Sequence, residues 1–570
     1  MATLELSHLF VRYRQDAAIN AVHDANFSLS PGESLGIVGE SGSGKSTLAM
    51  TVMGLLEAKT TVTGSIRLDG TELTTMTERQ RDGYRWRRIA IAFQNSLDVL
   101  NPVMTVGAQI AEAITRHMAL DRESADERAR QLFNMVGLEA KWLQAYPHEL
   151  SGGMRQKALI AMSLSCKPEI LIADEPTMAL DSESKAEIID LLKRLQSERG
   201  FSMIVISHEL QVVSALTSRI LVMYTGNVVE VGPTRAVLED PLHPYTRGLT
   251  YASPSIHPFR DMWGIPGEIV ITEETQCPFY SRCTQRIPAC LHQHPALETI
   301  RPDRQVACLR GGIVTLLTGV ALNKTYRTAG GAIRACDQCD IAIRAGEVVA
   351  LIGQSGSGKT TLAQMLCGIT RPDTGTAVFD GRTILGNSET RRTGGVQMVF
   401  QDPLSATNEA LSIEQIVREP LDILRSDTMA QRTAKVRSAL QQVQLPHDDL
   451  FLRRKGHTLS GGQRQRVAIA RALVMEPRLM IADEISSMLD PSTAANILRL
   501  LKGLQHLLGF SMLYITHDIA LARKIADTAY VMHKGRLVEH GPASRVLTSP
   551  NSEEAKRLLR KLGLDSSYGR

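Results

Sequence analysis

The sequence predicts an α/β protein in which one kind of domain occurs twice in tandem. Three observations predict it: motifs of the first half return in the second half at a nearly constant offset, short apolar runs end in glycine-rich loops or carboxylates, and helix-like stretches follow those loops. Short apolar runs of this kind are typical of buried parallel strands. We therefore expect two α/β domains, each with a buried sheet.

Four motifs carry the repeat. They are GESGSGKST (39–47) with GQSGSGKTT (353–361), LSGGMRQK (150–157) with LSGGQRQR (459–466), LIADE (171–175) with MIADE (480–484), and ISHE (206–209) with ITHD (515–518). The members of the first pair are 314 residues apart and those of the other pairs 309 apart. The shared offset places one domain at residues 1–255 and the other at 313–570, with a segment at 256–312 between them.

Composition limits the classes of protein. The chain of 570 residues is 43% hydrophobic and 22% charged, which is usual for a soluble globular protein. Its net charge of +4 gives no sign of nucleic-acid binding. No apolar run reaches the ~18–20 residues of a membrane helix, and the amino terminus lacks the pattern of a signal peptide. We therefore expect a cytoplasmic protein that meets a membrane only through partners.

A GxxxxGK[ST] loop in each copy follows an apolar strand and precedes a helix-like stretch. Its glycines let backbone N–H groups converge on phosphates, and the helix N-terminus adds a positive end. Lys45 and Lys359 are expected to neutralise the β- and γ-phosphates, and Ser46 and Thr360 to ligate Mg²⁺. A glycine-rich turn without a ligand is the alternative, and two matches in register with other motifs argue against it. The predicted nucleotide-binding residues of the loops are Gly39, Ser41, Gly42, Gly44, Lys45, Ser46 and Thr47, and Gly353, Ser355, Gly356, Gly358, Lys359, Thr360 and Thr361.

Two carboxylates end an apolar strand in each copy, in ILIADEPT and LMIADEIS. Asp174 and Asp483 are expected to hold the Mg²⁺ shell. Glu175 and Glu484 are expected to polarise the attacking water, a task that needs an acceptor within hydrogen-bond reach. The alternative is an acidic strand end that caps the next turn. A position at the carboxyl end of a strand beside a phosphate loop favours the catalytic interpretation.

LSGGMRQ and LSGGQRQ precede helix-like stretches and predict a second anion site in each copy. Ser151 and Gly153, and Ser460 and Gly462, are expected there, because a hydroxyl and free N–H groups at a helix start point at one spot. Alone, SGG indicates only a loop, and its position ahead of the Asp-Glu strand is what supports the site.

In this order the motifs resemble those of the ATP-binding cassette (ABC) ATPases over nearly the whole chain. The resemblance implies two P-loop NTPase ABC nucleotide-binding domains in tandem, each with a RecA-like α/β core and a helical signature subdomain. It also implies Q-loop residues that bind nucleotide and Mg²⁺ at Gln94 and Gln401, adenine stacking by Tyr13 and Tyr326, D-loop residues at Asp181 and Asp490, and catalytic switch histidines at His208 and His517.

Cassettes of that family pair head to tail, so the resemblance implies that each phosphate loop faces the signature of the other copy. One site would combine Lys45, Asp174, Glu175 and His208 with Ser460 and Gly462, and the other Lys359, Asp483, Glu484 and His517 with Ser151 and Gly153. Both copies keep the Glu and the His, so both are expected to hydrolyse ATP. The departures from the family's motifs are mild: Lys157 replaces Arg, Glu209 replaces Asp, and Ile-Ser follows Glu484 in place of Pro-Thr.

The segment at 256–312 has no helical or strand period, so we expect that packing alone does not order it. Three stretches resemble the carboxyl-terminal extension of the oligopeptide, dipeptide and nickel importer subfamily: PLHPYTRGL (241–249), GIPGE (264–268) and CPFYSRC (277–283). Four thiolates could hold an iron–sulfur cluster or zinc. The resemblance favours [4Fe–4S] over zinc, and free thiols are the alternative. These cysteines are Cys277, Cys283, Cys290 and Cys308.

Other candidate ligands carry less weight. His292 and His294 are alternative ligands, and we interpret them as exposed loop residues. The CxxC pair Cys336–Cys339 has no counterpart in the first copy, so we interpret it as incidental.

The subfamily resemblance implies the ATP-hydrolysing subunit of an importer for peptides or peptide-like small solutes, peripheral at the cytoplasmic face of the inner (plasma) membrane. Its partners would be two integral-membrane permeases and an extracytoplasmic solute-binding protein, without nucleic acid. The alternative is a soluble twin-cassette ATPase that acts on ribosomes or nucleic acid. Twin-cassette proteins that act on ribosomes carry iron–sulfur clusters at the amino terminus or join their cassettes by a long charged helical linker, and the Pro- and Cys-rich segment here fits neither. Cassette ATPases of DNA repair carry large insertions within the cassettes, and the compact spacing of the motifs here argues against that class.

Overall fold

A computed structural model describes most of the chain, and its residues fall into two compact units. The first unit contains the described residues up to 253 and those of 267–312, and the second contains 263–266 and those from 313 onward. The described residues are 2–13, 19–57, 59–93, 99–253, 263–270, 275–328, 331–386, 388, 392–402, 408, 410–425, 427–485, 487 and 489–561.

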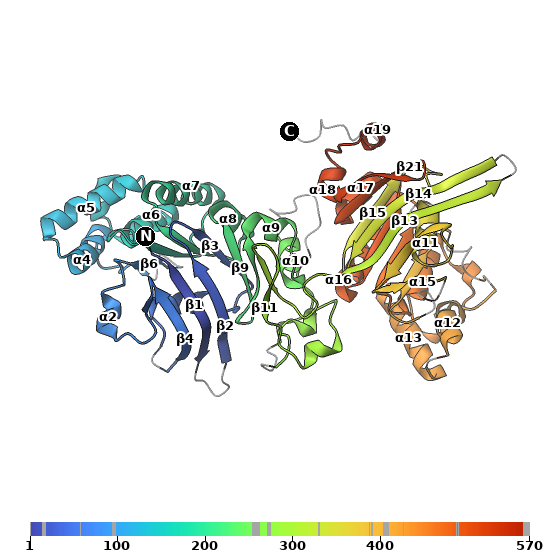
Figure 1. Cartoon of the computed structure of the whole chain (residues 1–570), viewed down its shortest axis with the longest axis horizontal. Helices are drawn as coiled ribbons and strands as arrows, with labels where there is room; N and C mark the ends of the chain where they lie inside the picture. Colours follow the sequence, from blue (N-terminus) through green and yellow to red (C-terminus); the bar gives the residue numbers. More distant parts are fainter. Residues whose placement is uncertain are drawn as a thin grey trace. The chain divides into compact units, whose positions relative to one another are not determined.

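The first unit is built on one mixed sheet (Figure 1). Among the described residues it has the strand order β5-β4-β1-β2-β10-β9-β3-β8-β7-β6, with β12 and then β11 added beside β10. The run β9-β3-β8-β7-β6 is parallel, and β1, β2 and β4 form an antiparallel part. The strands are β1 Leu4–Tyr13, β2 Ile19–Leu29, β3 Ser34–Val38, β4 Thr61–Leu68, β5 Thr71–Glu72, β6 Ile89–Ala92, β7 Ile170–Asp174, β8 Ser202–Ile206, β9 Arg219–Tyr224, β10 Asn227–Pro233, β11 Leu297–Arg301 and β12 Arg304–Ala307.

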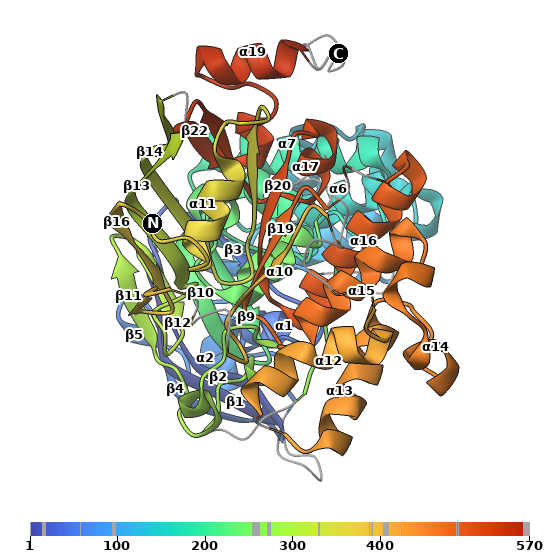
Figure 2. The ribbon, with the colours of Figure 1, turned by 90° about the vertical axis from the view of Figure 1, so that its right-hand side faces the viewer.

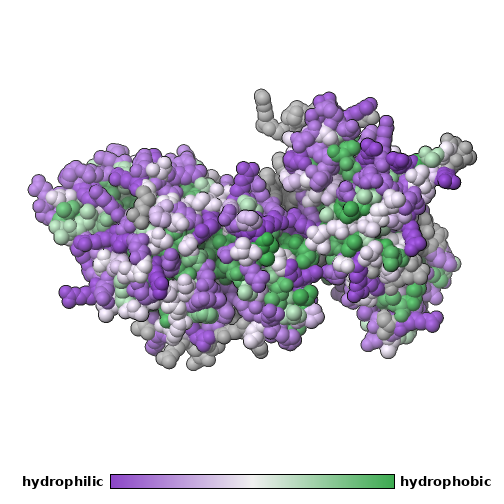
Figure 3. All heavy atoms as spheres, in the orientation of Figure 1, coloured by the Kyte–Doolittle hydropathy of each residue, from purple (hydrophilic) through white to green (hydrophobic). Residues whose placement is uncertain are grey.

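Every residue of β3, β7 and β8 is buried, as the apolar runs predict for central parallel strands. Helices α4, α5 and α6 share a separate apolar core to one side of the sheet (Figure 1). Hydrophilic side chains cover much of the face of α5 and α7 that Figure 3 shows. The helices are α1 Lys45–Met53, α2 Glu78–Asp82, α4 Val106–Met118, α5 Arg122–Met135, α6 Gly152–Ser163, α7 Ser182–Arg199, α8 Leu210–Leu216, α9 Thr234–Glu239 and α10 Pro244–Tyr251, with 3₁₀ turns η1 Ala140–Gln144, η2 Pro147–Glu149, η3 Tyr280–Arg282 and η4 Pro288–Leu291.

The second unit repeats this plan. Its parallel strands β18-β19-β20-β15-β21 continue into antiparallel β22, and β14-β13-β16-β17 form a second, antiparallel sheet. Helices α12, α13 and α15 pack together beside the parallel sheet (Figure 2). The strands are β13 Thr315–Thr328, β14 Gly331–Arg344, β15 Val348–Gly353, β16 Thr374–Phe379, β17 Arg382–Thr383, β18 Val396–Val399, β19 Leu479–Asp483, β20 Ser511–Thr516, β21 Thr528–His533 and β22 Arg536–Pro542. The helices are α11 Lys359–Leu366, α12 Ile413–Leu424, α13 Met429–Gln442, α14 Asp449–Arg453, α15 Gly461–Leu473, α16 Pro491–Leu508, α17 Ile519–Ile525, α18 Ala543–Val546 and α19 Glu553–Lys561, with η5 Gly456–Thr458. The predicted fold class, two α/β units each with a helical subdomain, is confirmed.

The expectation that packing alone does not order the segment after the first copy is wrong for its described residues. Strands β11 and β12 form an antiparallel hairpin, and β12 pairs with β10. The buried carboxylate of Glu230 on β10 binds Arg304 of β12 and the N–H groups of Leu242 and His243. This ion pair joins positions 74 residues apart in the chain, so no local period in the sequence could reveal it.

A short stretch ahead of the hairpin, residues 263–266, belongs to the second unit. The ring of Trp263 lies 5.2 Å from that of His506 on α16, and Gly264 accepts a hydrogen bond from the same histidine. In the part of the chain that the structure describes, no helix is both long enough and apolar enough to cross a membrane.

Candidate nucleotide-binding sites

Each phosphate loop joins a buried strand to a helix that begins at its lysine. Gly44 and Gly358 precede these helices with φ of 97° and 106°, in the left-handed region. A Cβ at Gly44 would lie 2.2 Å from the carbonyl oxygen of Ala21, and one at Gly358 would lie 2.0 Å from that of Ala335. Only glycine fits at either position, because the loop backbone passes directly against a neighbouring strand.

The loop lysines are buried and turned toward their own loops. Lys45 Nζ donates to the carbonyl oxygens of Gly39 at 2.8 Å and Glu40 at 2.9 Å. Lys359 Nζ makes the same contacts in the second loop and lies 3.5 Å from Glu484 Oε1. Burial lowers the pKa of Lys45, while the neighbouring carboxylates oppose that shift. Each lysine therefore stands where the loop and the strand-end carboxylates meet.

The strand-end aspartates lie against the hydroxyls predicted as Mg²⁺ ligands. The Ser46 hydroxyl hydrogen-bonds to Asp174, and Thr360 does so to Asp483. Burial raises the pKa of both aspartates, and these hydrogen bonds oppose the rise. In each aspartate the buried Oδ1 has no hydrogen-bond partner among the described residues. A buried carboxylate oxygen beside a hydroxyl is the hard-oxygen donor set that Mg²⁺ prefers, so these residues fit the ion.

Glu175 lies between the strand end and the predicted switch histidine. Its Oε1 accepts from the N–H of His208 at 3.0 Å and lies 2.8 Å from His208 Nδ1, and its Oε2 accepts from Ser207 Oγ at 3.1 Å. Its φ is 48°, which is unfavourable for a residue other than glycine. Such backbone strain concentrates at functional sites, where surrounding contacts hold it.

The second copy repeats the arrangement with looser contacts. Glu484 has a φ of 45°, and its Oε2 lies 3.5 Å from Nδ1 of His517. Gln401 Nε2 donates to the same oxygen at 3.4 Å and to Ser487 Oγ at 3.3 Å. The predicted Q-loop residue therefore meets the predicted catalytic carboxylate here. Its counterpart Gln94 lies outside the described residues.

The signature serines are helix N-caps. Ser151 Oγ accepts from the N–H of Met154 at 3.2 Å at the start of α6, and Ser460 Oγ accepts from that of Gln463 at 3.4 Å at the start of α15. The glycines that follow leave little room for a side chain. A Cβ at Gly153 would lie 3.1 Å from Ser184 Oγ, and one at Gly462 would lie 2.9 Å from Thr493 Cγ2.

The D-loop aspartates also cap helices. Asp181 accepts from the N–H groups of Glu183 and Ser184 at the start of α7, and Asp490 accepts from that of Thr493 at the start of α16. Hydrogen bonds from the N–H and hydroxyl of Ser184 lower the pKa of Asp181, and those from the hydroxyl and N–H of Thr493 lower the pKa of Asp490.

The predicted adenine-stacking tyrosines differ between the copies. Tyr13 ends β1, and its hydroxyl lies 3.3 Å from Thr47 Oγ1, so the structure brings it to the first phosphate loop. Tyr326 lies on β13 with 39% of its surface exposed, beside Lys324, whose Nζ is 5.8 Å from the ring centroid. The roles of both rings, and the pairing of each loop with the other copy's signature, stay predictions.

The four extension cysteines lie close together in the first unit. The N–H of Cys277 donates to the carbonyl oxygen of Cys290 at 2.9 Å. Burial raises the pKa of Cys277 to about 11 and that of Cys283 to about 12, and the thiols of the other members add to both shifts. Among the described residues, no three His, Cys, Asp or Glu side chains converge on the position of a single metal ion. The cysteines therefore form a loose cluster.

The prediction for His294 is wrong, and the interpretation of the CxxC pair Cys336–Cys339 as incidental stays a prediction. His294 is not an exposed loop residue: its ring lies 4.7 Å from that of His23, and its Nε2 lies 2.9 Å from Asn227 Oδ1. Cys336 and Cys339 are both buried in β14, where Cys339 Sγ lies 3.1 Å from the carbonyl oxygen of Gly535.

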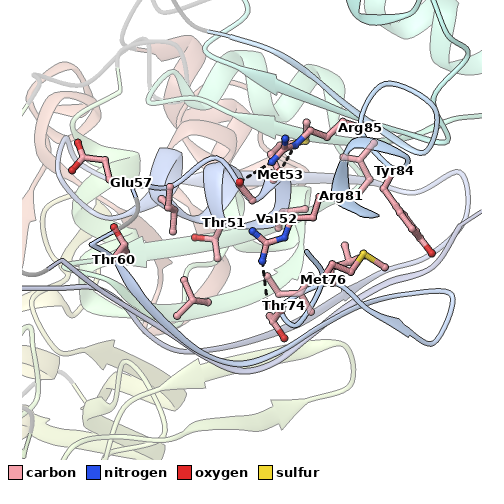
Figure 4. A pocket seen from close by; sticks show the side chains of 16 residues that line it. Thr51, Val52, Met53, Glu57, Thr60, Thr74, Met76, Arg81, Tyr84 and Arg85 are labelled. Carbon is pink, nitrogen blue, oxygen red and sulfur yellow. Dashed lines mark hydrogen bonds between the residues drawn. The ribbon is translucent and has the colours of Figure 1, made fainter. Parts of the chain in front are cut away.

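A cavity of about 320 Å³ lies in the first unit at the end of α1 remote from its phosphate loop (Figure 4). Thr51 and Met53 of α1 line it, together with Arg81, Tyr84 and Arg85. Both arginines are engaged: Arg81 donates to the carbonyl oxygen of Thr74, and Arg85 to those of Met53 and Gly54. None of the predicted nucleotide-binding residues lines this cavity.

Sequence reasoning missed one contact at the first loop. The carboxylate of Glu40, inside the loop, pairs with Arg282 of the extension. The only signal in the sequence is that the second loop has the neutral Gln354 where the first has Glu40.

Comparison with known proteins gives matches over both units. A model of the ABC transporter family matches residues 22–178 and 336–487, and a model of the oligopeptide/dipeptide transporter C-terminal region matches 229–290. The oligopeptide transport ATP-binding protein OppD of Mycobacterium tuberculosis (strain ATCC 25618 / H37Rv) is 36% identical over 98% of this chain and 97% of its own length. The glutathione import ATP-binding protein GsiA of Escherichia coli (strain K12) is 36% identical over 98% and 89%. The peptidoglycan transport ATP-binding protein YejF of Agrobacterium fabrum (strain C58 / ATCC 33970) is 35% identical over 98% and 95%.

Proposed function

The chain belongs to the ABC transporter family and is an ATPase, and from this we propose that it energises an importer of peptides or peptide-like small solutes. One observation carries the proposal. The relatives named for oligopeptide, glutathione and peptidoglycan transport match 98% of the chain, so the likeness includes both copies and the segment between them. We further propose that it works at the cytoplasmic face of a membrane with two permeases and an extracytoplasmic solute-binding protein.

We propose the following roles for the residues of the first copy. Lys45 neutralises the β- and γ-phosphates, which the N–H groups of its loop hold. Glu175 accepts a hydrogen bond from the attacking water, and His208 holds that carboxylate in place through the 2.8 Å contact of Nδ1. Asp174 and Ser46 would hold Mg²⁺, which when bound neutralises charge on the phosphates.

The residues of the second copy take the same roles. Lys359, Glu484 and His517 act on the phosphates and the water, and Asp483 with Thr360 would hold Mg²⁺. The loose 3.5 Å contact of His517 with Glu484 leaves that carboxylate room to close on a water. We propose that each site is completed by the signature of the other copy, Ser460 and Gly462 for the first and Ser151 and Gly153 for the second, so that ATP holds the copies together until hydrolysis releases them.

The importer proposal has a direct test. We expect the full chain to co-purify with integral-membrane permeases, and the reconstituted complex to hydrolyse ATP faster when the binding protein delivers a peptide. The measurement is phosphate release by proteoliposomes with and without solute. A chain that instead co-sediments with ribosomes, and whose turnover rises with ribosomes but not with peptide, would show that the soluble twin-cassette alternative is right.

We also propose that the four extension cysteines hold a [4Fe–4S] cluster. The four thiols lie near one another, yet among the described residues they do not converge on a single-ion position. Four cysteine thiolates are a ligand set that a [4Fe–4S] cluster takes. Because burial raises the pKa of the Cys277 and Cys283 thiols, cluster binding would release their protons.

The cluster proposal predicts iron and acid-labile sulfide in chain purified without oxygen, with the broad visible absorption of an iron–sulfur protein. Cys283→Ser should remove both, because Cys283 is the member whose thiol pKa burial raises to about 12. Cys166→Ser is the matched control, since Cys166 is buried in the same unit but outside the extension. Stoichiometric zinc, or a metal content that Cys283→Ser leaves unchanged, would contradict the cluster.

A further inference from the structure

Three polar groups of Glu40, the second residue of the first phosphate loop, are held by neighbours. Its N–H donates to the hydroxyl of Tyr245 at 2.8 Å, and its carbonyl oxygen accepts from Lys45 Nζ at 2.9 Å. Its carboxylate accepts two hydrogen bonds from the guanidinium of Arg282, at 2.8 and 3.1 Å. Two of these three neighbours, Tyr245 and Arg282, lie outside the nucleotide motifs, on α10 and in the extension.

Arg282 is fixed in this position. Its side chain is 3% exposed, and its guanidinium lies 5.8 Å from the ring centroid of Tyr224. Tyr224 and Tyr245 pack against each other and against Phe279 of the extension. A bidentate arginine–carboxylate pair in such a setting is geometrically specific. Removing Glu40 would leave the buried Arg282 charge without compensation, and removing Arg282 would leave the carboxylate of Glu40, which is 28% exposed, without its counterion.

The second phosphate loop has the same backbone contact without the charge. The carbonyl oxygen of Gln354 accepts from Lys359 Nζ at 3.0 Å, and the neutral side chain of Gln354 is exposed. The first loop with Arg282 therefore carries no more net charge at this position than the second loop does. A lone carboxylate there would belong to a residue whose own carbonyl oxygen the loop lysine contacts, close to where phosphates bind.

We propose that Arg282 is a positioning residue for ATP binding by the first copy: it neutralises and holds Glu40, and it thereby couples the extension to the first phosphate loop. Without Arg282, the carboxylate of Glu40 repels the phosphates and the loop loses its lateral support. The second copy needs no such residue, because its loop carries Gln354.

A double-mutant cycle in the full chain tests this proposal. Arg282→Gln, Glu40→Gln and the double variant are compared in a Lys359→Ala background, so that a fluorescent ATP analogue reports the first copy. We expect Arg282→Gln to raise the Kd of the analogue by about threefold to tenfold. The double variant, which gives the first loop the sequence GQSGSGK that the second loop has, should return to within about twofold of the parent Kd.

Recovery of the Kd in the double variant distinguishes a positioning role of Arg282 from a role in stabilising the extension alone. If Arg282→Gln and the double variant weaken binding equally, Arg282 only stabilises the extension and the proposal is overturned. It is also overturned if no variant changes the Kd. Gln354→Glu, measured in a Lys45→Ala background, gives the second loop the same carboxylate without adding an arginine. It should weaken binding there, and an unchanged Kd would contradict the charge argument.

Hydrogen exchange supplies a second readout that does not depend on turnover. Coupling is reciprocal, so ATP bound to the first copy must stabilise the Arg282–Glu40 contact as much as that contact favours ATP. We expect ATP to slow amide exchange over residues 277–291 in the parent chain and not in the double variant. Equal protection in both would show that ATP reaches the extension by another route and would contradict the role of this pair.

Discussion

Glu175→Gln in the full chain should reduce ATP turnover by about a hundredfold or more and leave ATP bound, because ATP that stays in the first site holds both copies closed and so stops turnover at the second as well. The amide keeps the shape of the side chain but cannot take up a proton from the attacking water, and loss of a general base costs about 10²–10⁴ in rate. Glu484→Gln should have the same effect in the second copy. Steady-state phosphate release and retention of radiolabelled ATP are the measurements.

The matched control is Glu127→Gln, a neutralisation of a half-exposed carboxylate on α5 that contacts Arg130 and Gln131 at the surface. It should leave turnover unchanged, because exposed ion pairs contribute little. If either Glu175→Gln or Glu484→Gln hydrolyses ATP at the parent rate, the claim of two active sites is wrong for that copy.

Arg304→Met should destabilise the first unit by about 3–5 kcal/mol, because it leaves the carboxylate of Glu230 buried without its counterion. Glu230 is 0% exposed and Arg304 5%, and the two link β10 to the hairpin β11–β12. Amide exchange over β10 and β12, read by mass spectrometry, gives the local opening free energy. An effect below about 1 kcal/mol would contradict the assignment of this pair as a main support of the hairpin.

The second copy offers the matched control. Glu539 lies at the position equivalent to Glu230 and pairs with Arg545 at 2.8 Å, but the side chain of Arg545 is 38% exposed. After Arg545→Met the Glu539 carboxylate, whose side chain is 6% exposed, keeps its hydrogen bonds from the N–H groups of Asn551 and Ser552 and from Ser552 Oγ. Water can also enter the space that the exposed arginine leaves, so a loss of about 1 kcal/mol or less is expected.

The loss in Arg304→Met should also depend on pH. Burial raises the pKa of Glu230, and the hydrogen bond from Arg304 opposes that rise. The variant therefore has an even higher folded-state pKa, so its folded state binds the proton more tightly than the unfolded chain does. Its stability deficit should be smallest below the unfolded pKa of about 4.3 and grow as pH rises through the folded pKa. A deficit independent of pH would show that packing rather than charge is lost.

The sequence could predict those site residues whose positions are set by a buried strand and by the turn that follows it. The phosphate loops, Asp174 with Glu175, and His208 all follow buried parallel strands, and the ends of such strands meet at one edge of a sheet. Their mutual contacts follow from that topology once the motifs are located in order.

The contacts of the extension could not be predicted in this way. Arg282 and Glu40 lie 242 residues apart, and a single arginine in an irregular segment carries no period. The same holds for Arg304 with Glu230. Such pairs are set by where a 3₁₀ turn or a short strand docks on the finished sheet, and they become visible only with the structure.

The docking of β12 on β10 also bears on where the first copy can be cut. The repeated motifs end well before residue 255, yet β10 receives its outer hydrogen bonds from Gln305 and Val306. A fragment that stops at 255 would present the free edge of a strand and an unpaired buried acid, which is a template for aggregation. The boundary of the first unit therefore lies near residue 312, because the last part of the unit packs on the edge of its sheet and does not serve only as a linker to the second unit.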